Sequence, residues 1–87
     1  MQIRKLSLSA LKVGDRAKIL GFKAGNVSYQ QRLLSMGLVP KLEFTVVRVA
    51  PLGDPVEIKI RNFFLCLRKD EADILELEQL LPAMGTV

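Results

Sequence analysis

The chain has 87 residues, 49% of them hydrophobic and 25% charged, with a formal net charge of +4. This length suits a single domain, and the hydrophobic share is too high for a disordered chain. Because there is no histidine and only one cysteine, Cys66, the composition excludes a His-dependent triad, an intramolecular disulfide and a zinc site with several Cys or His ligands. The first residues, 1–11, lack the continuous apolar core of a signal peptide, so we expect a cytoplasmic location.

The first half of the chain predicts one strand and one short helix. Polar and apolar residues alternate from Arg16 to Phe22, which indicates a strand. The stripe Tyr29, Leu33 and Met36 has helical spacing, so a helix of about two turns is expected. Asn26 or Ser28 is suited to cap its start, and Gly37 to end it, because glycine adopts the left-handed conformation at low cost.

The second half predicts strands joined by short turns. Strands are expected over 42–49, 56–61, 63–68 and 74–78, where β-branched or alternating residues occur. Pro51 and Pro55 bracket a turn, because proline cannot donate to a sheet ladder. Residues 70–73 read as a single helical turn capped by Asp70.

About five strands with one or two short inserted helices predict a mainly β fold. An SH3-like β-barrel, closed on itself, is the first choice, and an OB-like barrel the second. We expect one domain over residues 1–81 and a flexible tail over 82–87.

The two strands on either side of Arg61 and Asn62 form a predicted β-hairpin with a fixed register. Asn62 is suited to positive φ in a two-residue turn. Ile60 then faces Phe63, Ile58 faces Leu65 and Val56 faces Leu67, and this apolar set is the predicted core face. Phe64 lies opposite Lys59, and Cys66 opposite Glu57, on the outer face.

The outward Phe64 has two interpretations. Either the N-terminal residues Ile3, Leu6 and Leu8 or the helix cover it, or Phe64 and Cys66 belong to an exposed apolar patch that binds a partner.

Charge is distributed unevenly along the chain. Residues 1–41 hold eight Lys or Arg against one acid, whereas residues 42–87 hold five against eight. The basic half is either a solvated face or a nucleic-acid contact. The carboxylates Asp70, Glu71 and Asp73 are suited either to a hard cation or to the start of a short helix. No phosphate-loop motif is present, and the composition points to no cofactor and no metal site.

Four segments together resemble the FeoA family, small cytosolic SH3-like proteins of bacterial ferrous iron transport. The matching segments, in chain order, are Leu8–Asp15, Arg32–Pro40, Ala50–Val56 and Leu65–Ala72. The run Arg-Leu-x-x-Met-Gly-Leu followed by Ala-Pro-Leu-Gly-Asp-Pro is the specific part. Two departures from the family pattern are Lys41 and Asn62, where relatives often have glycine in a turn.

The resemblance implies a non-enzymatic accessory protein that acts with FeoB, a membrane ferrous-iron transporter with a cytosolic GTP-binding domain. It implies no iron binding by this chain, although weak transition metal ion binding and self-association stay open. The candidate protein-interaction residues, inferred from expected exposure, are Met36, Leu38, Leu52, Asp54, Pro55 and Phe64.

Two alternative functions remain at this stage. A small basic barrel can bind nucleic acid, although no nucleic-acid partner is expected here because no aromatic–basic motif stands out. A regulator of a partner's GTPase activity would need a suitable arginine, and Arg32 and Arg68 are the residues to test.

Overall fold

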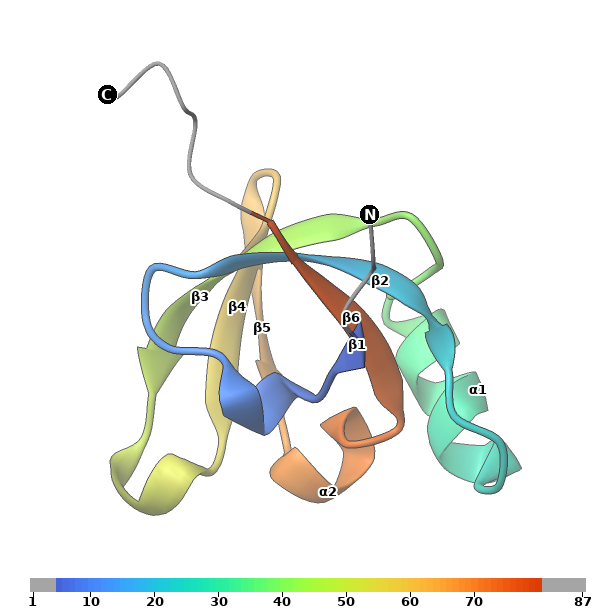
Figure 1. Cartoon of the computed structure of the whole chain (residues 1–87). Coiled ribbons are helices and arrows are strands. Elements are labelled where there is room, and N and C mark those ends of the chain that lie inside the picture. The colour runs from blue at the N-terminus through green and yellow to red at the C-terminus, as the bar shows by residue number, and fades with distance from the viewer. Residues whose placement is uncertain (1–4, 81–87) are drawn as a thin grey trace.

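The computed structural model describes residues 5–80, which form one curved antiparallel sheet with short helices at its margins (Figure 1). The strand order is β1-β6-β2-β3-β4-β5. In chain order the elements are β1 (Lys5–Leu6), the 3-10 helix η1 (Leu8–Ala10), β2 (Arg16–Phe22), α1 (Val27–Ser35), β3 (Glu43–Val49), the 3-10 helix η2 (Pro51–Gly53), β4 (Val56–Ile60), β5 (Phe63–Leu67), α2 (Lys69–Ala72) and β6 (Leu75–Leu80).

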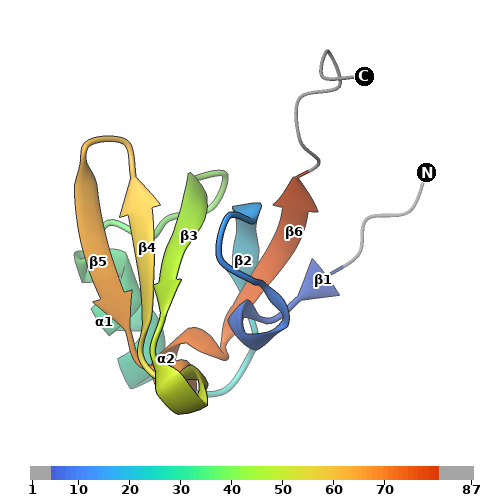
Figure 2. The same ribbon diagram turned by 90° about the vertical axis from the view of Figure 1, so that its left-hand side faces the viewer.

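The predicted mainly β fold with two short helices is confirmed. Five strands have five or more residues, and the additional strand is the two-residue β1. The expectation of a closed sheet is wrong in one respect. Within residues 5–80, β1 pairs only with β6 and β5 only with β4, so the two edges of the sheet do not join (Figure 2).

Helix α1 begins and ends where its sequence signals predicted. The side chain of Asn26 accepts a hydrogen bond from the Tyr29 N–H at 3.0 Å, and Gly37 adopts φ +95° after the last turn. Leu33 is fully buried and anchors the helix, whereas Tyr29 is only half-buried. A nine-residue helix is marginal alone in water, so this packing is what stabilises it.

The β4–β5 hairpin has the predicted register at every position. Val56 pairs with Leu67, Ile58 with Leu65 and Ile60 with Phe63, and Lys59 lies opposite Phe64. The turn differs in one detail, because Arg61, not Asn62, adopts the left-handed conformation, with φ +52°.

The core lies on the concave side of the sheet. Its fully buried large side chains are Ile19, Leu33, Leu38, Val46, Ile58, Leu67, Leu75 and Leu77. None of the helices within residues 5–80 is long and apolar enough to cross a bilayer. The predicted tail at residues 82–87 lies outside the described residues.

Candidate functional site

Strand β5 carries an exposed apolar surface at one edge of the sheet. The side chains of Phe63 and Phe64 are 46% and 55% exposed, and Cys66 is an exposed free thiol. Phe64 and Cys66 lie on the outer face of the sheet and Phe63 on the opposite face, because successive side chains of a strand alternate. We call Phe64 and Cys66 the hairpin patch. The interpretation in which the N-terminal segment or the helix covers Phe64 is therefore wrong: Leu6 and Leu8 pack into the core, and Ile3 lies outside the described residues.

Phe63 was predicted to lie in the core, and the structure corrects this. It is on the same face as Ile60, which is only 2% exposed, but β5 is an edge strand and Phe63 is its first residue. Since no described strand lies beyond β5, Phe63 is covered from one side only. Coverage improves along the strand: Leu65 is half-buried and Leu67, next to α2, is fully buried.

Phe64 is held by a neighbour on the adjacent strand. The Nζ atom of Lys59 lies 5.9 Å from the centroid of the Phe64 ring, within the range of a cation–π contact. The pair crosses from β4 to β5 on the outer face, as the register requires.

The turn before β4 holds three of the predicted interaction residues. Leu52 is fully exposed and adopts φ +71°, and Asp54 and Pro55 are exposed as well. The carboxylate of Asp54 accepts a hydrogen bond from the backbone N–H of Lys69 at 3.0 Å. The prediction that Asp70 caps α2 is therefore wrong, because Asp54, far away in the sequence, accepts this first N–H of the helix.

The two predicted interaction residues after α1 lie differently from what was expected. Leu38 is fully buried, so its expected exposure is wrong and it belongs to the core. Its backbone N–H donates to the carbonyl of Leu33, which turns the chain inward after Gly37. Met36 is half-buried and packs against the core.

The remaining candidates do not form one surface. Leu52, Asp54 and Pro55 precede the first residue of β4, whereas Phe64 lies close to the hairpin turn that follows its last residue. Five strand residues separate these ends, a distance of roughly 17 Å. In Figure 2 the turn and the β4–β5 hairpin loop lie at opposite ends of the sheet.

Sequence reasoning missed a pocket of about 550 Å³ over the neighbouring strands β2, β3 and β4. We call it the basic pocket; its lining residues are Arg16, Lys41, Leu42, Glu43, Phe44, Thr45, Lys59 and Arg61. Four of these are cations, and they come from both the basic and the acidic halves of the chain. The uneven charge distribution therefore did not locate it, because only the sheet brings these residues together.

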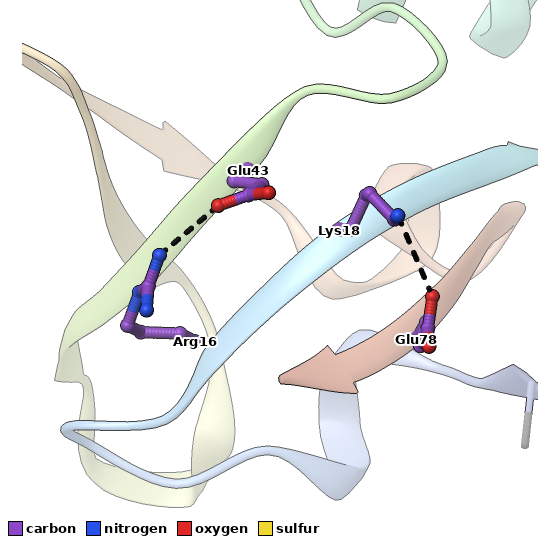
Figure 3. A network of polar contacts seen from close by, with 4 residues as sticks. All are labelled: Arg16, Lys18, Glu43 and Glu78. Carbon is purple, nitrogen blue, oxygen red and sulfur yellow. Dashed lines mark hydrogen bonds and ion pairs between the residues drawn. The ribbon is translucent and has the colours of Figure 1, made fainter. Parts of the chain in front are cut away.

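Ion pairs on the outer face connect neighbouring strands (Figure 3). Arg16 of β2 bonds Glu43 of β3 at 3.0 Å, and Lys18 of β2 lies 3.8 Å from Glu78 of β6. All four side chains are substantially exposed, so each pair contributes on the order of 0–1 kcal/mol.

The carboxylates of α2 serve the structure of the helix margin. Glu71 forms an ion pair with Arg32, whose Nε lies 2.9 Å from the carboxylate, and this pair ties α2 to α1, while Asp70 and Asp73 are exposed. Arg32 is thus engaged by a carboxylate, and Arg68 is exposed at the start of α2. Within residues 5–80 no group of three or more His, Cys, Asp or Glu side chains is placed to hold a metal ion.

Residues 6–79 match the family model described as the FeoA domain. One curated relative, an "Fe(2+) transport protein A/Fe(2+) transporter FeoB fusion protein" of Porphyromonas gingivalis, is 38% identical over 73 residues. The match covers 84% of this chain and 8% of the fusion protein, so the chain corresponds to a small part of that relative.

Solved structures show the same fold. Iron(II) transport protein A from Clostridium thermocellum is 42% identical, with a TM-score of 0.74 over 84% of this chain and 44% of that one. FeoA from Stenotrophomonas maltophilia, solved with zinc and described as an SH3 domain protein, has a TM-score of 0.71 at 23% identity, over 86% of this chain and 95% of that one. The predicted SH3-like fold is confirmed by these likenesses.

Proposed function

Because the chain belongs to the FeoA domain family, we propose that it is a small cytoplasmic accessory protein of bacterial ferrous iron uptake, without enzymatic activity, that binds the cytosolic part of a FeoB-type transporter. The observation that carries this proposal is the fusion relative, whose name joins a transport protein A and a transporter FeoB in one polypeptide. Two units that work in contact gain effective concentration when one chain joins them.

The hairpin patch supports the proposal because it offers a surface for a partner. On β5, Phe64 on the outer face and Phe63 on the opposite face are each about half exposed, which places apolar surface on both sides of this free strand edge. Aromatic side chains in such positions supply much of the energy of protein contacts.

The edge of β5 adds backbone groups to the same surface. In the antiparallel ladder of a two-residue hairpin, Phe63, Leu65 and Leu67 bond to β4, so the N–H and C=O groups of Phe64 and Cys66 point to the free edge. A strand of the partner can add there through main-chain hydrogen bonds. The patch therefore combines apolar contact with strand addition.

Charges at the ends of β5 favour a partner strand over self-association. Arg61 precedes the strand, and Arg68 and Lys69 follow it, all three exposed. If two copies paired antiparallel along β5, Arg61 of one would meet Lys69 of the other, and such like-charge pairs are destabilising. An extended segment with an apolar centre and acidic residues at its ends fits this edge better.

Binding to the transporter's purified cytosolic domain tests the proposal, measured by calorimetry with GDP and with a non-hydrolysable GTP analogue. We expect a complex that Phe64→Ser weakens by at least about tenfold, since a hot-spot aromatic contributes on the order of 2 kcal/mol or more. Val27→Ser, which changes a 62% exposed side chain on α1, is the matched control and should bind like the wild type.

The outcomes of this binding experiment test the transporter as partner and the hairpin patch as contact surface separately. Absence of a complex with either nucleotide, in a folded sample, would refute the transporter as partner. A complex that Phe64→Ser leaves intact would keep the partner but exclude the hairpin patch. A Leu52→Ser variant then tests the turn at the other end of β4, and the partner's GTP hydrolysis rate shows whether binding regulates it.

A further inference from the structure

The basic pocket has a large excess of positive charge. It contains Arg16, Lys41, Lys59 and Arg61 against one carboxylate, that of Glu43, which is already bonded to Arg16 at 3.0 Å. Within residues 5–80, no carboxylate lies within ion-pair distance of Lys41, Lys59 or Arg61. Lys41 from one segment, and Lys59 and Arg61 from the β4–β5 hairpin, thus line the pocket without a counter-charge from the described protein, and the Lys59 Nζ also lies 5.9 Å from the Phe64 ring centroid.

Two of these cationic residues have a backbone conformation that is unfavourable for residues other than glycine. Lys41 has φ +76° and Arg61 has φ +52°, the left-handed region in which glycine is least costly. The described part of the chain has one other non-glycine residue at positive φ, Leu52. Such strain concentrates at sites that bind ligands, where the side chain is needed in spite of the backbone. Turn geometry alone would favour glycine at both positions.

We propose that the basic pocket binds a small anion that carries two adjacent phosphate groups. Three uncompensated cations match the charge of a diphosphate, the Arg61 guanidinium can bond two phosphate oxygens at once, and the Lys41 and Lys59 ammonium groups act as mobile point charges. Thr45 adds a hydroxyl donor to the lining. A volume of about 550 Å³ lies in the range of small-molecule sites and exceeds the size of a single phosphate. This inference does not depend on the proposed transporter partner.

Titration with pyrophosphate tests the proposal, followed through the backbone amide shifts of the lining residues 16, 41–45, 59 and 61. We expect saturable shifts confined to these residues, which sodium chloride at the same ionic strength does not reproduce. Shifts that sodium chloride reproduces, or that spread over all lysine-bearing segments, would overturn the site, because they would report general screening.

The double variant Lys41→Gly/Arg61→Gly removes two cations and relieves both strained positions. Its melting temperature should not fall, while its affinity for pyrophosphate should drop by about tenfold or more for each lost charged hydrogen bond. Wild-type affinity in this folded variant would refute the pocket.

Three further variants separate the effects of charge, of backbone conformation and of position inside or outside the pocket lining. Leu52→Gly makes the same backbone change without removing a charge, and Lys23→Ala removes an exposed lysine outside the lining; both should bind like the wild type. Glu43→Gln removes the one carboxylate of the pocket and should raise the affinity. Equal weakening by Lys23→Ala would contradict a specific site.

A second arm distinguishes a free phosphate compound from a lipid headgroup. Vesicles of phosphatidylcholine doped with a phosphoinositide that carries two phosphate groups on neighbouring ring carbons are sedimented with the protein, with and without pyrophosphate. Retention in the supernatant, together with the pyrophosphate shifts, supports a soluble ligand. Sedimentation that pyrophosphate reverses assigns the same phosphate chemistry to a headgroup, and sedimentation unaffected by pyrophosphate, with no shifts, overturns the proposal.

Discussion

The Asp54 carboxylate accepts the backbone N–H of Lys69 at 3.0 Å and so connects the turn before β4 to the first residue of α2. Fifteen positions separate the two residues, and the β4–β5 hairpin lies between them. The hydrogen bond therefore closes the base of the hairpin. Asp54, predicted to contact a partner, has a structural function that any binding experiment must take into account.

Asp54→Ala should lower the free energy of unfolding by about 1 kcal/mol, because α2 loses the acceptor for its first N–H group. Urea unfolding followed by circular dichroism measures this. Asp70→Ala is the matched control, since its exposed carboxylate caps nothing and should cost less. An equal loss in both variants would mean that general charge near the helix start, not the bond to Lys69, stabilises α2.

Asn26→Ala should also cost about 1 kcal/mol, because the Tyr29 N–H loses its side-chain acceptor at the start of α1. The other predicted cap, Ser28, lies inside the helix, and its substitution by alanine should be nearly neutral. Thermal unfolding of both variants checks the assignment, which a larger effect at Ser28 would contradict.

The Arg32–Glu71 pair should couple more strongly than the surface pair Arg16–Glu43. Both arginines are substantially exposed (Arg32 63%, Arg16 49%), but the Glu71 side chain is only 14% exposed against 50% for Glu43, so water screens the first pair less at its carboxylate. Double-mutant cycles with Arg32→Met/Glu71→Gln and Arg16→Met/Glu43→Gln measure the coupling. We expect about 1 kcal/mol for the first and a few tenths for the second; the reverse order would refute the argument from burial.

Phe64→Ala should change the free energy of unfolding by less than about 1 kcal/mol, because the ring is already more than half exposed. Leu67→Ala, on the same strand but fully buried, should cost about 2–5 kcal/mol. Chemical unfolding of the two variants provides the comparison. A large loss of stability in Phe64→Ala would mean that the hairpin patch is needed for folding. If stability is retained, weaker binding by Phe64→Ser reports the lost contact with the partner and not unfolding.

The sequence pattern predicted strand β2 and the limits of helix α1 well, because each of these features depends on residues that are close together in the chain. The alternation over Arg16–Phe22, the cap at Asn26 and the left-handed Gly37 each depend on a few neighbouring residues, and all three appear as predicted. The hairpin register was equally predictable, since a two-residue turn leaves one pairing that keeps the apolar residues of β4 on one face.

The failures share a different cause. Phe63 follows the apolar pattern of its strand, yet it is 46% exposed because β5 is an edge, and strand order is not visible in the alternation. Leu38 follows a helix-ending glycine, where exposure is usual, but the chain turns inward there. Asp70 satisfies the local rule for a cap, whereas the acceptor that α2 uses comes from Asp54.

The sequence by itself determined the mainly β fold, the hairpin register, the limits of α1 and the resemblance to one family, because periodicity, turn chemistry and motif spacing are written along the chain. Tertiary structure alone decided which strand is the edge, and so left both Phe63 and Phe64 exposed. It also brought Arg16, Lys41, Lys59 and Arg61 around one pocket. Both depend on which segments meet across the sheet, and a contact between distant segments has no period or spacing to reveal it.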